Sequence, residues 1–109
     1  MTQSLAGLHI LITLADGESH GYAIMQDVAA RTGGALRLGP GTLYGSIKRM
    51  LHDGLIEELD DRPHPDEDDA RRRYYRITPR GKKVAREEIG RLATLVRQAR
   101  ATGLAVKVG

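Results

Sequence analysis

Residues 39–54 read GPGTLYGSIKRMLHDG and decide the fold. Pro40 is favoured at a first helical position, because the N–H that it lacks would have no partner there. Gly54 is a typical residue just beyond a helix end. Between them, apolar residues recur at helical spacing: Leu43, Ile47, Met50 and Leu51. The stretch therefore predicts a helix from Pro40 to about Asp53 with one buried face.

The opposite face of this helix has no carboxylate before Asp53. It carries Thr42, Gly45, Lys48, Arg49 and His52, with Tyr44 and Ser46 at its edges. Hydroxyl and basic groups suit contact with phosphates and base edges. Glycine is costly inside a helix, and a close approach of another backbone would explain it. An ordinary solvated face is the alternative that composition leaves open.

The residues before this helix predict two more helices. Residues 4–15 place Leu5, Leu8, Leu11, Ile12 and Ala15 on one face, with Ile10 and Leu14 on the opposite face. A helix that is apolar on two sides is usually covered on two sides, and we expect a second subunit to supply the second cover. Residues 19–32 form the next predicted helix, which ends at Gly33-Gly34.

The residues after it predict a β-hairpin and a last helix. Residues 55–59 and 72–78 alternate in polarity, and a polar loop joins them. Thr78 and Pro79 then suit the start of a helix. Its apolar residues have the 4, 3, 4, 3 spacing of a coiled-coil seam: Ala85, Ile89, Leu92, Val96 and Ala99.

This order of elements is that of a winged helix-turn-helix. The predicted fold class is mainly α with a small β-hairpin, and a C-terminal dimerisation helix follows it. We expect residues 1–80 to form the DNA-binding unit, residues 81–103 the dimerisation helix and residues 104–109 a frayed tail. A small α+β protein without a nucleic-acid role is the alternative.

Composition narrows the function classes. The chain has 109 residues, 40% hydrophobic and 28% charged, and no cysteine. No apolar run reaches membrane-spanning length, and the N-terminus lacks a secretory signal, so we expect a cytoplasmic protein with no membrane partner. Residues 60–69 hold six acids against Arg62, whereas residues 70–83 hold seven bases and no acid. A basic stripe of this kind favours a polyanion partner.

The sequence offers little for catalysis or metal binding. There is no glycine-rich phosphate loop with its lysine, and paired carboxylates occur only in a loop expected to be exposed. His52 and His64 match no metal-ligand spacing. We therefore expect no enzyme activity, no metal and no cofactor.

Three stretches resemble the PadR family of bacterial transcriptional regulators. The first is Gly39 to Tyr44, followed by Ile47, Met50-Leu51 and Gly54-Leu55-Ile56. The second is Leu14 with His20-Gly21-Tyr22-Ala23-Ile24, and the third runs from Arg73 to Gly81. Together they lie within residues 5–81. The resemblance implies a winged-helix homodimer, held by the C-terminal helix, that usually represses its own or a neighbouring promoter.

The chain departs from the family pattern at two places. Gly45 stands where proline often follows the tyrosine, which can change how the recognition helix starts. The predicted wing tip, Asp66 to Asp69, is acidic and repels phosphate. We therefore expect the wing base, Arg71 to Arg73, to contact the DNA backbone. The alternative is that these arginines only neutralise the acidic tip.

Two sets of residues follow from these arguments. The DNA-binding set is His20, Tyr22, Thr42, Tyr44, Gly45, Ser46, Lys48, Arg49, Arg71, Arg72 and Arg73. Within it, Lys48 and Arg49 are the candidates for base edges or nearby phosphates, and Tyr44 could instead be a half-buried core residue. The dimer set is Leu8, Ile10, Leu14, Ala85, Ile89, Leu92, Val96 and Ala99.

The expected partners are a two-fold-related double-stranded operator, a second copy of the chain and a small-molecule effector whose identity the sequence leaves open. The resemblance implies an effector because some family members bind flat aromatic drugs or phenolic acids between subunits. The chain has no Trp and no Phe, which excludes a tryptophan sandwich but leaves an aliphatic pocket near Leu8, Ile12 and Leu92. A winged helix that docks a basic protein through its acidic wing is the alternative function.

Overall fold

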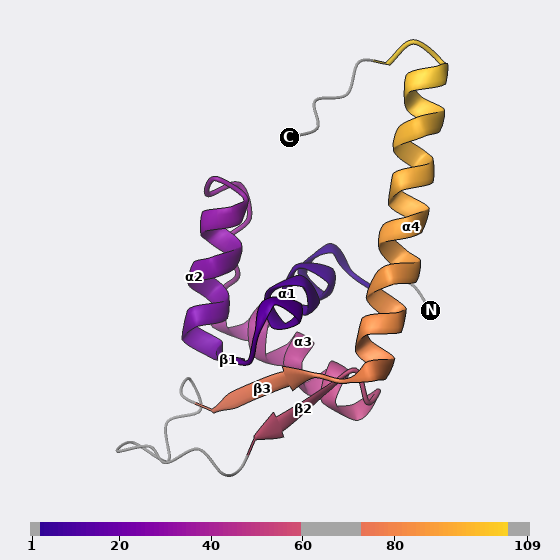
Figure 1. Cartoon of the computed structure of the whole chain (residues 1–109). Helices are drawn as coiled ribbons and strands as arrows, with labels where there is room; N and C mark the ends of the chain where they lie inside the picture. The colour runs from indigo at the N-terminus through magenta and orange to yellow at the C-terminus, as the bar shows by residue number, and fades with distance from the viewer. Residues whose placement is uncertain (1–2, 60–72, 105–109) are drawn as a thin grey trace.

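The computed structural model describes residues 3–59 and 73–104 (Figure 1). In these ranges the elements run α1 (Leu5–Asp16), β1 (Ser19–His20), α2 (Gly21–Arg31), α3 (Pro40–His52), β2 (Ile56–Leu59), β3 (Tyr74–Ile77) and α4 (Pro79–Ala101). The predicted fold class, helices with a small β-sheet in winged helix-turn-helix order, is confirmed.

Side chains just before the helices define where three of them begin. The Ser4 hydroxyl accepts a hydrogen bond from the Gly7 N–H at 3.0 Å. The His20 Nδ1 accepts one from the Ala23 N–H at 3.2 Å, and the Thr78 hydroxyl accepts one from the Gly81 N–H at 3.0 Å. Each bond pairs an N–H that has no partner within its helix.

The sheet has three antiparallel strands in the order β1-β3-β2. The hairpin register pairs Ile56 with Ile77 and Leu59 with Tyr74, while β1 pairs Ser19 with Tyr75. The sequence placed residues 19–20 in the second helix, and this is wrong. A strand of two residues is too short to show an alternation of polar and apolar side chains. It forms only because it pairs with β3, which is distant in the sequence.

Helix α1 lies at the centre of the molecule and contacts α2, α3, α4 and β3 (Figure 1). Its predicted dimer residues Leu8, Ile10 and Leu14 are at most 5% exposed, so their assignment to a subunit interface is wrong. Elements of the same chain cover Leu8, Ile10, Leu11 and Leu14 on both apolar sides of α1, whereas Leu5 remains 64% exposed. Ala85 of α4 also belongs to this core and leaves the dimer set for the same reason.

A polar clamp fixes α2 on α1. The Thr13 hydroxyl donates to the Asp27 carboxylate at 2.7 Å, and the Arg31 Nε donates to the same oxygen at 2.9 Å. Arg31 also donates to the Thr13 hydroxyl and, at 3.0 Å, to the His9 carbonyl. The hydrogen bond from Thr13, with the charge of Arg31, holds the pKa of Asp27 below its ordinary value of 3.8.

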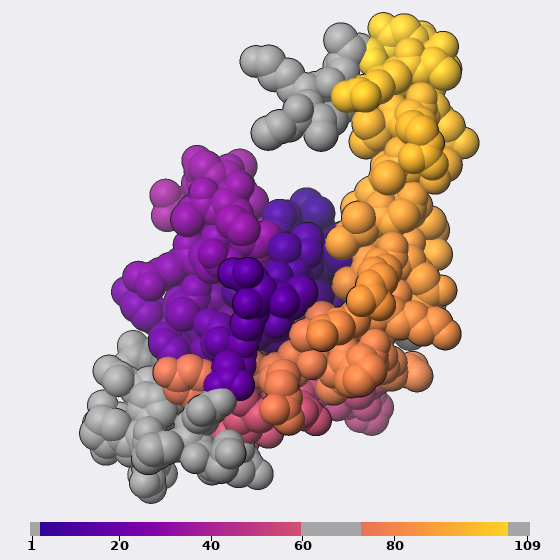
Figure 2. All heavy atoms as spheres, in the orientation of Figure 1, coloured from indigo at the N-terminus to yellow at the C-terminus, as the bar shows by residue number. Residues whose placement is uncertain are grey.

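Helix α4 packs on the body only through its first half. Its buried residues are Gly81, Ala85 and Glu88, and Glu88 accepts a hydrogen bond from Arg91 at 2.5 Å. The rest of the helix projects beyond the body, as Figure 2 shows in yellow, and the molecule measures 54 × 28 × 21 Å. Ile89, Leu92 and Leu95 remain 43%, 45% and 60% exposed, respectively.

Candidate nucleic-acid interface

Helix α3 separates a buried face from a polar face, as its sequence predicted. Leu43, Ile47 and Met50 are at most 2% exposed and pack in the core. The exposed residues are Thr42, Gly45, Lys48, Arg49 and His52. Within the described residues, the Lys48 ammonium and the Arg49 guanidinium form no ion pair or hydrogen bond. Both charges are therefore available to an external anion.

Gly45 leaves an open position on this face. A Cβ built there would meet no atom of the described chain within 4 Å. Packing inside the protein therefore does not require glycine at this position. A close approach by a partner remains the physical reason for a residue that weakens the helix.

Two predicted contact residues do not lie on the exposed face. Ser46 is only 6% exposed and lies on the flank that faces α1, so it cannot reach a base in an open groove. The Tyr44 hydroxyl is also buried. It lies against the start of α2, since a Cβ built on Gly21 would be 2.5 Å from it. Tyr44 is thus a half-buried residue packed against the core, which is the alternative that the sequence left open to DNA contact.

The start of α2 contributes one aromatic residue to the surface. Tyr22, a member of the predicted DNA-binding set, is 50% exposed. His20 caps α2 through Nδ1 and meets Tyr74 edge to face, with ring centroids 5.3 Å apart. Its ring therefore has a structural role at this end of the sheet.

The wing is described only at its base. Arg73 is exposed and lies 3.7 Å from Glu58, and Arg76 donates to Glu57 across the strands at 2.8 Å. Tyr75 covers the core at 3% exposure, and its burial raises the pKa of its hydroxyl. Arg71, Arg72 and the acidic residues 66–69 lie outside the described residues.

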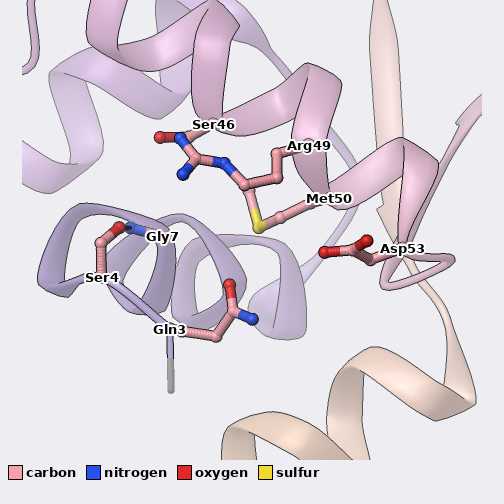
Figure 3. A pocket seen from close by; sticks show the side chains of 7 residues that line it. All are labelled: Gln3, Ser4, Gly7, Ser46, Arg49, Met50 and Asp53. Atoms are coloured by element: carbon pink, nitrogen blue, oxygen red, sulfur yellow. Dashed lines mark hydrogen bonds between the residues drawn. The ribbon is translucent and has the colours of Figure 1, made fainter. Parts of the chain in front are cut away.

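The sequence missed a small polar hollow between α1 and α3. It has a volume of about 60 Å³ and is lined by Gln3, Ser4, Gly7, Ser46, Arg49, Met50 and Asp53. Figure 3 shows the Arg49 and Ser46 side chains extending from α3 on the side of the first turn of α1. The sequence pattern of α3 alone could not show that α1 would begin at this flank.

A second, apolar hollow lies between α1 and α4. Its volume is about 430 Å³, and it is lined by Leu11, Ile12, Ala15, Ile77, Lys82, Ala85, Arg86 and Ile89. Of the three residues expected near an effector pocket, only Ile12 lines it. Leu8 is buried in the core and Leu92 lies farther along α4.

Residues 3–59 and 73–104 contain no group of three His, Cys, Asp or Glu side chains placed to hold a metal ion. No helix in the same ranges is long and apolar enough to cross a bilayer.

The order of the elements and the polar face of α3 define a winged helix-turn-helix protein. A family model described as "Transcriptional regulator PadR-like family" matches residues 10–87. The chain belongs to this family, which consists of transcriptional regulators and not of enzymes. The resemblance and the expectation of no enzyme activity are thereby confirmed.

Two relatives show how much of the chain is shared. The transcriptional regulator Rv3488 of Mycobacterium tuberculosis is 36% identical over 91 residues, which cover 84% of this chain and 78% of that protein. An uncharacterized 37.1 kDa protein in transposon TN4556 of Streptomyces fradiae is 34% identical over 90 residues, or 83% of this chain. The match spans only 24% of the length of the Streptomyces protein.

Solved structures share the fold. A transcriptional regulator from Clostridium thermocellum has a TM-score of 0.75 and 26% identity, and the match covers 92% of this chain and 90% of that one. Bacillus subtilis PadR, solved in complex with operator DNA, has a TM-score of 0.65 and 20% identity. That match covers 78% of this chain and 46% of the Bacillus chain, and at this identity it shows the fold alone.

Proposed function

We propose that the chain is a cytoplasmic, homodimeric repressor that binds a two-fold-related operator. The observation that carries the proposal is the exposed face of α3, where Lys48 and Arg49 have no partner among the described residues. Family membership supplies the regulatory role. In this arrangement α3 enters the major groove, and Lys48 contacts base edges or phosphates beside the open position at Gly45.

The second subunit covers the projecting half of α4 in this proposal. Ile89 and Leu92 are exposed, and Val96 and Ala99 continue the same apolar seam. A two-fold dimer presents two α3 helices to successive major grooves, about 34–36 Å apart. Dimerisation also doubles the formal charge of +3 per chain, which strengthens attraction to DNA.

The test compares two duplexes at two salt concentrations. One duplex is enriched from a random pool by repeated selection on the purified protein, and the other is a scrambled version of it. We expect tighter binding to the selected duplex and a steep loss of affinity with salt. Lys48→Ala should weaken binding, whereas the charge-matched control Arg97→Ala, on the projecting half of α4, should not.

Equal affinity for both duplexes would contradict sequence-specific recognition and leave only attraction to phosphate. Absence of binding to either duplex at low salt would contradict the DNA-binding proposal itself. Light scattering on the same samples should report a dimer. A monomer that binds with full affinity would remove the two-fold geometry from the proposal.

A further inference from the structure

We infer that the hollow between α1 and α3 is a phosphate-binding site that holds a backbone phosphate of the DNA at the edge of the major groove. This assignment rests on the DNA-binding function proposed above. It makes Arg49 a contact to a backbone phosphate and not to a base edge. The site joins Arg49 and Ser46 of α3 to the first turn of α1, lined by Ser4 and Gly7.

Three groups at one end of the hollow favour an anion. The Arg49 guanidinium forms no ion pair or hydrogen bond within the described residues. The Ser46 hydroxyl belongs to a residue that is 6% exposed, lines the hollow and has no hydrogen-bond partner in the same residues. The Ser46 hydroxyl is not among the buried side-chain atoms that lack a partner, so it reaches the solvent in the hollow and can meet an anion there.

The start of α1 adds the third group. Its first turn contains no acidic residue, and the Ser4 hydroxyl accepts only the Gly7 N–H. The earlier N–H groups of a helix have no partner within it and carry partial positive charge, which favours a phosphate. In Figure 3 the Arg49 and Ser46 side chains both extend from α3 on the side of this turn, and both line the hollow.

Asp53 limits where an anion can lie. Its carboxylate lines the same hollow, but in Figure 3 the Met50 sulfur lies between it and the Arg49 head. The phosphate therefore occupies the end formed by Arg49, Ser46 and α1. The repulsion from Asp53 also favours a singly charged phosphodiester over a doubly charged free phosphate.

The site lies beside the groove-facing side of α3 and not on it. Lys48 is one residue away on the helix and does not line the hollow. An α-helix in the major groove has phosphates along both its flanks, and contacts to them fix its position without reading sequence. Arg49 and the start of α1 would bind a phosphate on one of these flanks.

The experiment scans the selected duplex with neutral methylphosphonates, one phosphate at a time. For the unmodified protein we expect one position in each half-site where the replacement weakens binding by about tenfold. Arg49→Ala and Ser46→Ala should bind more weakly and lose this sensitivity, whereas Lys48→Ala should keep it. Ser46→Ala should fold normally, because its hydroxyl has no partner in the described chain.

The variants also separate phosphate contact from base reading. Arg49→Ala should weaken the selected and scrambled duplexes equally and lower the salt slope by about 1 per site. Arg49→Lys should recover most of the affinity, because a lysine can hold a phosphate but does not reproduce a bidentate contact with guanine. Asp53→Asn should strengthen binding to both duplexes. A loss confined to the selected duplex, or no sensitive phosphate, would overturn the inference.

A further arm separates this inference from the proposed function. Amide shifts of Gly7 and Ser46 are followed while inorganic phosphate is added at constant ionic strength. If the protein binds no duplex and these shifts still saturate, the hollow takes free phosphate and the DNA assignment is wrong. If neither DNA nor phosphate has an effect, there is no anion site, and the inference fails together with the proposed function.

Discussion

At the scale of single residues, glycines show where space is required and where it is not. A Cβ on Gly81 would lie 2.1 Å from the Leu55 carbonyl oxygen, so this glycine lets α4 start against the turn before β2. Gly45 and Gly90 are also in helices, but a Cβ on either would meet nothing within 4 Å. Only the first of the three has a packing reason inside the protein.

We predict that Gly45→Ala separates stability from function. The free energy of unfolding should rise by about 0.5–1 kcal/mol, because alanine loses less conformational freedom in a helix. Affinity for the selected duplex should fall, since the new methyl group occupies the face that we propose meets DNA. Denaturant unfolding and anisotropy titration measure the two effects. Gly90→Ala is the control that should stabilise the fold without changing the affinity per dimer.

The clamp between α1 and α2 predicts a dependence on acid. Because the pKa of Asp27 is lowered from 3.8, its contribution to stability is present above that value and is lost as the pH falls through the lower, folded pKa. Thr13→Val removes the largest cause and should raise the pKa of Asp27. The stability gap between the two proteins should be widest near neutral pH and narrow in acid.

Carboxyl chemical shifts of Asp27, followed against pH, measure the change directly. Denaturant unfolding at several pH values measures its effect on stability. Asp27→Asn supplies the control, because it removes the titrating group. An unchanged Asp27 pKa in Thr13→Val would contradict the assigned cause.

At the scale of elements, α3 has different surroundings on its two flanks. Tyr44 lies against the start of α2, whereas Ser46 and Arg49 face the start of α1. The exposed residues between these flanks form the face that we propose enters the major groove of DNA. The helix is therefore positioned from both sides by the N-terminal ends of two other helices.

The start of α4 is fixed to the end of α3 by one hydroxyl. Thr78 caps α4 and also donates to the Gly54 carbonyl at 2.7 Å. We predict that Thr78→Ala lowers the free energy of unfolding by about 1–2 kcal/mol, because the cap and this link are lost together. Thermal unfolding checks the value. Thr94→Ala, which removes two exposed hydrogen bonds, one to the Gly90 carbonyl and one from Arg97, should have a much smaller effect.

At the scale of the whole molecule, the projecting half of α4 is the part that lacks packing partners in the described chain. Within the described chain its apolar residues have nothing to pack against, since the body reaches only to about Glu88. A row of exposed leucine and isoleucine side chains on one helix is typical of a surface that another protein covers. A second copy of α4 completes it most simply.

We predict that Leu92→Asp combined with Val96→Asp yields a monomer. Neither residue belongs to the core, so the winged helix should remain folded while the seam is disrupted by charge. Affinity for a two-site duplex should fall much more than affinity for a half-site. Sedimentation and circular dichroism report assembly and folding. A dimer that survives both substitutions would place the interface elsewhere.

The sequence by itself determined the order of the four helices and the two hairpin strands, the start of α3 and α4, and the polar face of α3. These depend on local signals, such as Pro40 at a helix start, Thr78 as a cap and apolar residues at helical spacing. The same local signals carried the family resemblance, because the matching stretches coincide with a helix start, a wing strand and a helix entry. Such features do not depend on which element packs on the opposite side of the core.

Only the tertiary structure decided which apolar and polar faces stay exposed. Ile10 and Leu14 look like interface residues in sequence, yet α1 is surrounded by the chain's own elements and both are buried. Ser46 and Arg49 look like groove residues, yet they line a hollow with the start of α1. Periodicity gives the direction of a side chain around its own helix, but only packing brings a second element to that side.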